Sequence, residues 1–332
     1  MILPLGTYFM QLTLTIDIPA LPKPVTYSDS ILLIGSCFTE HISERLAKHK
    51  FKVLSNPHGI LFNPLSVANS LGSYIENRLY TEDGLFYLNE LWNSWDHHTR
   101  FSNIEAAETL KQINHSQQEA ATFIKKASWV IITLGSAFQY HLVENGKPVA
   151  NNHRAPAKWF EKKLLRAEEI VNALQNTLKK LYAINPSAQV LFTISPVRHI
   201  RDGVVDNNRS KARLIEAVHA LCATYQNAHY FPAYELVIDV LRDYRFYDID
   251  FVHPNYLATQ FVWEQFAGSC IEPAAKIIMQ QVLEIVTARS HRPRFPGTEA
   301  HRKFKEEYLT KTKQLLKQHP YLDMSEELRY FA

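Results

Sequence analysis

The chain has 332 residues, of which 46% are hydrophobic and 21% are charged, and its formal net charge is +3 at pH 7. This composition is typical of a globular protein with a large core, and the small net charge argues against a nucleic-acid partner. The three cysteines contain no CxxC pair, which argues against a disulfide framework and a zinc finger, so we expect a reducing, cytoplasmic compartment.

Residues 1–19 are apolar but do not match a signal peptide or a membrane anchor. No basic residue precedes the apolar run, and Pro4 and Gly6 interrupt it. The run is also too short to span a bilayer, so no transmembrane segment is predicted. Residues 11–18 alternate between apolar and polar side chains and predict an edge strand.

The first strong element is the apolar run at residues 31–34, which predicts a strand buried on both faces. Gly35 ends this strand, Ser36 and Cys37 follow, and an amphipathic helix is predicted from Thr39. Such a unit places a small nucleophilic side chain at the carboxyl edge of a sheet, where open α/β sheets bind their ligands. The N–H groups at the start of the helix would face an anion there.

Strands and helices alternate along the rest of the chain to residue 270. Further strands are predicted at residues 51–54, 128–134, 189–194 and 230–232, and helices at residues 64–80, 105–126, 165–182, 209–226, 234–242 and after 254. Residues 139–150 predict a hairpin around an Asn-Gly turn, and the aromatic-rich residues 91–102 predict a loop. The alternation predicts a parallel sheet with helices on both faces.

Residues 271–332 predict a helical extension of the α/β domain, which we place at residues 10–270. A proline-containing joint at residues 292–297 interrupts the extension. The helix at residues 298–317 is rich in lysine and arginine, and we interpret it as a solvated face in preference to a contact with an acidic partner or a membrane.

The loop before the last helix of the α/β domain carries a second set of reactive side chains. Asp250 and His253 lie close together in the sequence, and a histidine held by a carboxylate is a common general base. With Ser36 or Cys37, this pair would supply a nucleophile, a base and a carboxylate that orients the base.

The motif GSCF at residues 35–38, followed by LGSAF, SPVRH and DFVHPN, resembles the GSCFA family, which is grouped with the SGNH/GDSL hydrolase-like proteins. The resemblance runs from about residue 18 to residue 270. It implies a flavodoxin-like, three-layer α/β/α fold with the nucleophile after the first strand. It also implies that His253 is the general base and that Asp250 holds its other ring nitrogen.

The resemblance places the nucleophile on Cys37. When IGDSLTE of the hydrolases is aligned with IGSCFTE of this chain, their catalytic serine falls on Cys37 and their aspartate on Ser36. His253 and the helix N–H groups would lower the thiol pKa, and the thioester formed would pass its acyl group to water, an alcohol or an amine. A nucleophilic Ser36 and a merely hydrophobic Cys37 remain the alternatives, whereas Cys222 and Cys270 are assigned to the core.

The oxyanion would be stabilised by backbone N–H groups of Cys37 or its neighbour and of Gly59. The hydrolases add an asparagine side chain from a later block, and this chain has Gly135-Ser136-Ala137 in that place. The Ser136 hydroxyl or an N–H group of Gly135 or Ser136 would have to serve instead.

Four further residues are candidates for substrate binding. His58 precedes Gly59 and either contacts substrate or is a turn residue, and His153 follows the hairpin with similar roles open. Arg198 and His199 follow a strand and form a cationic pair suited to a carboxylate or phosphate, unless the arginine caps carbonyl groups. No histidine spacing typical of a metal site is present, so no metal is predicted.

Together with these residues, the resemblance implies an esterase or acyltransferase that acts on a small acyl ester, such as an O-acyl group on a sugar or a carrier. No cofactor is predicted, and acetyl-CoA is a candidate co-substrate. We expect a small-molecule substrate and no nucleic-acid partner, and the oligomeric state stays open. The alternative is a catalytically inactive SGNH-like module that binds a ligand.

Overall fold

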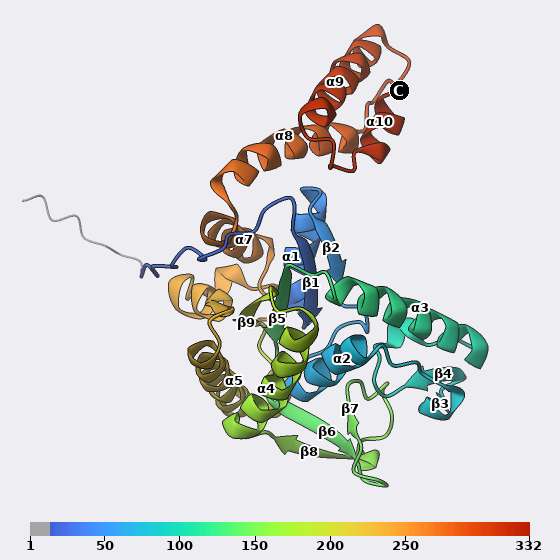
Figure 1. Ribbon diagram of the computed structural model, residues 1–332, viewed down its shortest axis with the longest axis vertical. Helices are drawn as coiled ribbons and strands as arrows, with labels where there is room; N and C mark the ends of the chain where they lie inside the picture. The colour runs from blue at the N-terminus through green and yellow to red at the C-terminus, as the bar shows by residue number, and fades with distance from the viewer. Residues whose placement is uncertain (1–13) are drawn as a thin grey trace, which may run out of the picture.

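The computed structural model describes residues 14–332 and has a five-stranded sheet at its centre (Figure 1). The strands are β1 (Ser30–Gly35), β2 (Lys52–Ser55), β5 (Trp129–Leu134), β9 (Gln189–Ile194) and β10 (Ala228–Phe231). They lie in the order β10-β9-β5-β1-β2, and every neighbouring pair is parallel. The predicted parallel sheet is confirmed.

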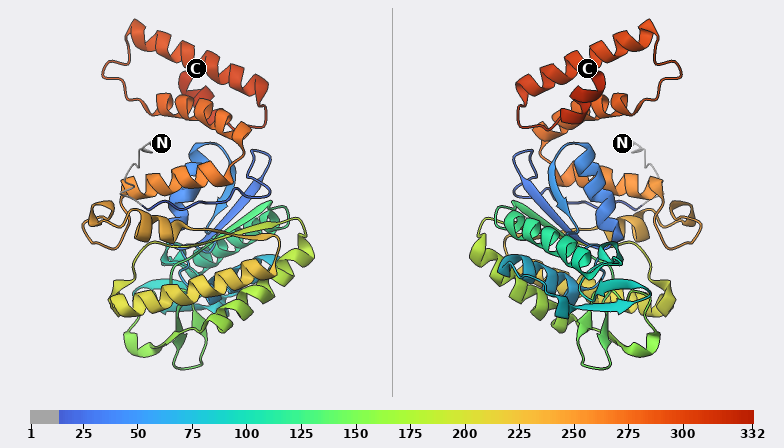
Figure 2. Two further views of the ribbon diagram at one scale, coloured as in Figure 1. Left: turned by 90° about the vertical axis from the view of Figure 1, so that its left-hand side faces the viewer. Right: turned by 90° about the vertical axis from the view of Figure 1, so that its right-hand side faces the viewer.

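Helices cover both faces of the sheet (Figure 2). On one face lie α1 (Cys37–Lys48) and α7 (Tyr256–Cys270), and on the other lie α2 (Pro64–Glu76), α3 (Ala106–Ile124), α4 (Ala167–Ile184) and α5 (Val204–Thr224). Strand β1 contributes side chains to the cores on both faces of the sheet. Ile31 and Leu33 pack on the face of α1 and α7, and Leu32 and Ile34 pack on the opposite face. This is the predicted three-layer, flavodoxin-like α/β/α arrangement.

The strand register brings three carboxyl ends together. Gly35 of β1 pairs with Thr133 of β5, and Thr133 pairs in turn with Thr193 of β9. The three strands therefore end side by side, at the edge where open α/β sheets bind ligands. The segments that leave this edge are those in which the sequence predicts reactive side chains.

Two small antiparallel sheets extend the domain. They comprise β3 (Leu85–Leu88) with β4 (Leu91–Ser94), and β6 (Phe138–Leu142) with β7 (Pro148–Val149) and β8 (Phe160–Leu164). The β6–β7 pairing confirms the hairpin predicted in residues 139–150. The loop predicted at residues 91–102 is wrong at its start, because β4 pairs with β3 there. The edge strand predicted at residues 11–18 lies partly outside the described residues, and residues 14–18 form no strand.

Two helix predictions need correction. Helix α1 begins earlier than predicted, at Cys37, so Ser36 takes the N-cap position and Cys37 lies in the first turn. The helix predicted at residues 234–242 is a short α-helix (Ala233–Glu235) that continues as a π-helix (Leu236–Val240).

The region beyond α7 is helical, as predicted. Its helices are α8 (Pro273–Ser290), α9 (Glu299–Gln318) and α10 (Ser325–Phe331). They share a small core of their own, which includes Val282 and Phe331. The first turns of α8 belong instead to the core of the sheet through Ala275 and Met279. A division of the chain at residue 271 therefore stays a prediction.

The basic helix α9 carries its cations next to carboxylates. Arg302 pairs with Glu299 and Glu306, and Lys311 pairs with Glu284 and Glu307. Such pairs on exposed helix faces are usual for a solvated surface. Within the described part of the chain, no helix combines the length and the apolar composition needed to cross a bilayer.

Candidate active site

The turn between β1 and α1 is fixed by a close approach of two backbones. Gly35 has a φ of +144°, and a Cβ atom on it would lie 2.1 Å from the carbonyl oxygen of Thr133. Only glycine fits this contact. The Ser36 N–H donates to the same oxygen at 3.1 Å. Strands β1 and β5 are therefore held together where α1 begins.

Ser36 and Cys37 follow this turn and differ in exposure. The Ser36 side chain is fully buried, and its Oγ has no hydrogen-bond partner within residues 14–332. Cys37 is partly exposed in the first turn of α1. A substrate can therefore reach Cys37 more readily than Ser36, which favours the cysteine as the nucleophile.

The pKa of the Cys37 thiol is raised in the structure. Burial is the largest cause, and the negative charge of Glu40 adds to it. The N–H groups of Phe38 and Cys37 and the charge of Lys211 lower the thiol pKa without reversing the shift. The prediction that this turn lowers the thiol pKa is therefore wrong, because burial outweighs the start of the helix. Cys37 needs a base in order to react.

Asp250 and His253 are paired as predicted. Oδ2 of Asp250 lies 2.6 Å from Nδ1 of His253. Oδ1 of Asp250 accepts the N–H groups of Val252 and His253 at 2.9 and 3.0 Å. These bonds, with the side-chain bond to His253 as the largest cause, lower the pKa of Asp250 to about 2. Since Nδ1 is held by the carboxylate, Nε2 is the ring nitrogen left to accept a proton.

The His253 ring is not hydrogen-bonded to either candidate nucleophile. Among the residues that the structure describes, no hydrogen bond connects it with Cys37 or Ser36. Burial is the largest cause of the lowered pKa values of His41 in α1 and of His199, and His253 contributes to both, so its ring lies near both. The His253 side chain is 49% exposed, which leaves it room to rotate. The Asp250–His253 pair is thus assembled without a hydrogen bond to either candidate nucleophile among the described residues.

The N–H groups that we expected to stabilise an oxyanion are already bonded. The Gly59 N–H donates to the Asn56 carbonyl at 2.7 Å, and those of Gly135 and Ser136 donate to the Phe62 carbonyl at 2.8 and 2.9 Å. The Ser136 Oγ accepts a backbone N–H as well. The expectation of free backbone N–H donors at Gly59, Gly135 and Ser136 is therefore wrong, whereas the Ser136 hydroxyl keeps an O–H that can donate. The N–H groups at the start of α1, by contrast, face the thiol.

Two of the candidate binding residues are buried in the packing. Nδ1 of His58 lies 2.8 Å from Ser70 Oγ, and its Nε2 lies 2.9 Å from Gln117 Oε1. Nε2 of His153 lies 2.8 Å from the Ser94 carbonyl oxygen. The prediction that His58 and His153 contact substrate is wrong, because both side chains are buried and bind neighbours inside the protein.

Arg198 and His199 do not form a cationic pair. Burial, followed by the charge of Lys211, lowers the pKa of His199 to about 3, so its ring is neutral at pH 7. The Arg198 guanidinium lies over the Tyr247 ring at 4.8 Å from its centroid, and Arg198 stays partly exposed. The prediction of a two-residue anion clamp is therefore wrong, and Arg198 alone remains a candidate for an anionic group.

Lys211 belongs to the site although the sequence analysis did not single it out. Its side chain is buried, and its Nζ donates to the carbonyl oxygens of Gly135 and Ser195 at 2.7 and 2.6 Å. Burial lowers the pKa of Lys211 to about 7. The pattern that could have revealed it is its spacing on α5, where it shares the apolar face with Leu214 and Val218. A lysine on such a face is rarely buried without partners.

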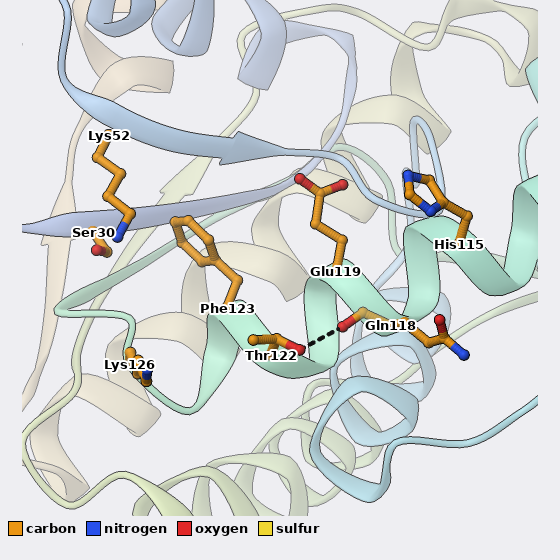
Figure 3. Close-up of a pocket in the computed structure, with 8 residues that line it drawn as sticks. All are labelled: Ser30, Lys52, His115, Gln118, Glu119, Thr122, Phe123 and Lys126. Atoms are coloured by element: carbon orange, nitrogen blue, oxygen red, sulfur yellow. Dashed lines mark hydrogen bonds between the residues drawn. The ribbon is translucent and has the colours of Figure 1, made fainter. Parts of the chain in front are cut away.

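A pocket of about 470 Å³ lies elsewhere on the domain (Figure 3). Ser30 and Lys52, the first residues of β1 and β2, line it together with Glu119 and Phe123 of α3. Since β1 and β2 are parallel, this is the amino-terminal edge of the sheet, opposite to Cys37. The described residues include no group of three or more His, Cys, Asp or Glu side chains arranged to hold a metal ion.

Comparison with known proteins gives one family and a distant structural likeness. The model of the GSCFA family matches residues 30–266, and that of the GSCFA domain protein, C-terminal domain, matches residues 282–332. Among solved structures, the chain is similar to an acetyl xylan esterase (Est2A) from the rumen bacterium Butyrivibrio proteoclasticus, with 13% identity and a TM-score of 0.37. That likeness covers 74% of this chain and 64% of the esterase chain. No curated protein matches the chain.

Proposed function

The chain belongs to the GSCFA family, and we propose that it is an esterase or acyltransferase that forms an acyl-enzyme on Cys37. The observation that carries the proposal is the 2.6 Å contact between Asp250 Oδ2 and His253 Nδ1. A carboxylate at Nδ1 fixes the tautomer that accepts a proton at Nε2, and it stabilises the imidazolium that forms.

In the proposed reaction, His253 Nε2 takes the proton from the Cys37 thiol while the sulfur attacks the ester carbonyl carbon. The carbonyl oxygen becomes an oxyanion. Its double bond re-forms when the bond to the alcohol oxygen breaks, and His253 gives the proton to that oxygen. Because burial raises the pKa of the Cys37 thiol, proton transfer accompanies the attack instead of preceding it.

The thioester left on Cys37 has two fates. Water, or an acceptor alcohol or amine, attacks its carbonyl carbon while His253 removes a proton, and the sulfur leaves and regains that proton. We propose a small acyl ester on a sugar or a carrier as the substrate and acetyl-CoA as a candidate acyl donor. We propose that the Arg198 side chain binds an anionic group on the substrate. The backbone N–H of Arg198 donates to the Val252 carbonyl at 3.2 Å, which connects the Arg198 segment to the His253 loop.

The proposal is tested by intact-protein mass spectrometry after brief exposure to p-nitrophenyl acetate and, separately, to acetyl-CoA. We expect an acetyl-sized adduct on the wild type that is absent from Cys37→Ala and strongly reduced in His253→Ala. Cys222→Ala removes another partly exposed thiol and is the matched control. An adduct that persists in Cys37→Ala and disappears in Ser36→Ala would move the nucleophile to Ser36.

A ligand-binding module without catalysis is the second candidate. The raised pKa of the Cys37 thiol and the lack of a hydrogen bond from His253 to Ser36 or Cys37, among the described residues, favour it. The assembled Asp250–His253 pair opposes it. A folded wild-type protein that forms no adduct with either donor would favour the binding module.

A further inference from the structure

Two buried polar side chains, those of Ser36 and His199, lie beside Gly135 just after the end of β5. Among the described residues, neither Oγ of Ser36 nor Nε2 of His199 has a hydrogen-bond partner, and both atoms are buried. A Cβ atom on Gly135 would lie 3.3 Å from Ser36 Cβ and 3.3 Å from His199 Nε2. The two side chains therefore approach one point from different elements. Buried polar atoms nearly always have partners, so this pair indicates a place for a polar ligand atom.

Lys211 fixes the backbone around this point. Its Nζ donates to the carbonyl oxygens of Gly135 and Ser195, which follow β5 and β9. The Gly135 N–H donates to the Phe62 carbonyl. Both polar groups of the Gly135 backbone are thus in use, and the side-chain atoms of its neighbours are left to bind a ligand.

The His199 segment is anchored through its backbone, and its ring packs against a neighbouring aromatic ring. Its backbone N–H donates to Asn207 Oδ1 at 2.8 Å. The ring packs edge-on against Phe62, with 5.5 Å between the centroids. A donor that is already oriented needs no reorganisation when charge develops on a substrate, which is the property that an oxyanion site requires.

We propose that His199 Nε2–H and the Ser36 hydroxyl donate hydrogen bonds to the oxyanion that forms on the substrate carbonyl oxygen. The inference rests on the proposed acyl-enzyme at Cys37, the residue next to Ser36. It gives His199 the place of the asparagine donor that is missing from the segment Gly135-Ser136-Ala137. It also explains why Gly135 carries no side chain, since a Cβ atom would crowd His199 Nε2 and the Cβ atom of Ser36.

His199 is suited to be a donor more than a base. Burial lowers its pKa to about 3, so its ring would hold a proton from a thiol only weakly at pH 7. A neutral imidazole still donates from its protonated nitrogen. His253 has the carboxylate that a base requires, at 2.6 Å from its Nδ1. The two histidines therefore have different roles: His253 transfers the thiol proton, and His199 binds the oxyanion.

The test compares acylation with alkylation of Cys37 in the full chain. Acyl-enzyme formation with p-nitrophenyl acetate is followed by rapid quench and intact-protein mass spectrometry. Alkylation by iodoacetamide is followed in the same proteins, because that reaction uses the thiol but forms no oxyanion. The variants are His199→Leu, which removes the donor, His199→Gln, which keeps an N–H donor, and Ser36→Ala.

We expect His199→Leu to slow acylation on the order of 10²- to 10³-fold, the usual cost of one lost oxyanion donor. His199→Gln should recover most of that loss, and alkylation should stay at the wild-type rate in all variants. Ser36→Ala should slow acylation alone, and this small change keeps the test valid if His199→Leu does not fold.

Wild-type acylation rates in both His199→Leu and Ser36→Ala would overturn the inference while leaving the acyl-enzyme in place. An equal loss of acylation and alkylation in His199→Leu would also overturn it, because His199 would then act on the thiol. A wild type that forms no adduct on Cys37 overturns both the inference and the proposed function.

Discussion

Oδ2 of Asp250 and Nδ1 of His253 lie 2.6 Å apart on a single loop, in the absence of any substrate. The loop is organised by its own hydrogen bonds. Asn255 Nδ2 donates to the Arg245 carbonyl at 2.7 Å, and the Asp248 N–H donates to the His253 carbonyl at 2.8 Å. The orientation of His253, the proposed base, is therefore set by hydrogen bonds within its own loop. Substrate binding would then have to bring only the ring close to α1.

Asp250→Asn should remove most of the activity without unfolding the loop. An amide at this place would donate to Nδ1 of His253 and leave the proton on Nε2, so the ring could no longer accept one. We expect kcat/KM for ester cleavage to fall on the order of 10³- to 10⁴-fold, with most of the loss in kcat. Asp248→Asn changes a neighbouring exposed carboxylate and should keep wild-type kinetics. Wild-type activity in Asp250→Asn would contradict the base assignment.

The raised pKa of the Cys37 thiol depends in part on Glu40, which is also on α1. Its negative charge disfavours the thiolate, so Glu40→Gln should lower the thiol pKa. The pH profile of iodoacetamide alkylation should then shift to lower pH, and alkylation at neutral pH should be faster than in the wild type.

The matched control for this shift is Glu44→Gln, which removes the next carboxylate along α1. Since Glu40 is the carboxylate that raises the pKa of the Cys37 thiol, the Glu44→Gln profile should overlay that of the wild type. A Glu40→Gln profile that stays in place or moves to higher pH would show that burial alone sets the thiol pKa.

The sequence predicted the features that depend on neighbouring residues. The apolar run at residues 31–34 predicted a strand buried on both faces because both sheet faces need apolar side chains. The pairing of Asp250 with His253 was predictable because one short loop brings them together. The parallel sheet followed from the alternation of strands and helices, and the three-layer arrangement from the family resemblance.

The sequence could not predict features that depend on distant segments. The Phe62 carbonyl takes the N–H groups of Gly135 and Ser136, which local turn chemistry does not reveal. The thiol pKa of Cys37 is set by burial, and burial is a property of the whole packing. The sequence shows Lys211 only as a charge on the apolar face of α5. That pattern does not reveal that its Nζ donates to carbonyl groups at the ends of two strands.

Lys211→Met should change the pH dependence of stability. Burial lowers the pKa of Lys211 to about 7 in the folded protein, whereas an unfolded lysine titrates near about 10.4. Between these values the unfolded chain binds more protons, so the free energy of unfolding rises with pH. The contribution of Lys211 is at most about 1.4 kcal/mol per pH unit.

Urea unfolding between about pH 7 and 9 measures this linkage. The wild type should gain stability relative to Lys211→Met as the pH rises, because deprotonation relieves the cost of the buried charge. Lys158→Met removes an exposed lysine and should run parallel to the wild type. A Lys211→Met curve parallel to the wild type would mean that the folded-state pKa is not lowered.

Gly35→Ala should prevent the β1–α1 turn from forming. The new Cβ would lie 2.1 Å from the Thr133 carbonyl oxygen, and the φ of +144° is a conformation that alanine rarely adopts. We expect a loss of more than about 4 kcal/mol in the free energy of unfolding, or failure to fold. Gly72→Ala in α2 meets nothing within 4 Å and should stabilise the protein by about 0.5–1 kcal/mol. A Gly35→Ala protein of native stability would contradict the structure of the turn.

Glu327 of α10 connects the helical C-terminal region to the sheet. Its side chain is fully buried, and its carboxylate lies 2.9 Å from Lys50 Nζ and 3.3 Å from Arg289 Nε. Lys50 follows α1, whereas Arg289 belongs to α8. Removing the buried charge leaves two cations without their shared partner, which is costly because little water can replace it.

Glu327→Gln should therefore loosen the C-terminal helices at a cost of about 3 kcal/mol. Limited proteolysis between α8 and α9, at residues 291–298, and urea unfolding would measure the change. Glu326→Gln is the matched control, because Glu326 pairs with the same Arg289 but is 60% exposed, and exposed pairs contribute less than about 1 kcal/mol. Equal effects of the two variants would show that the buried carboxylate does not hold the region in place. A larger effect of Glu327→Gln would show that it does.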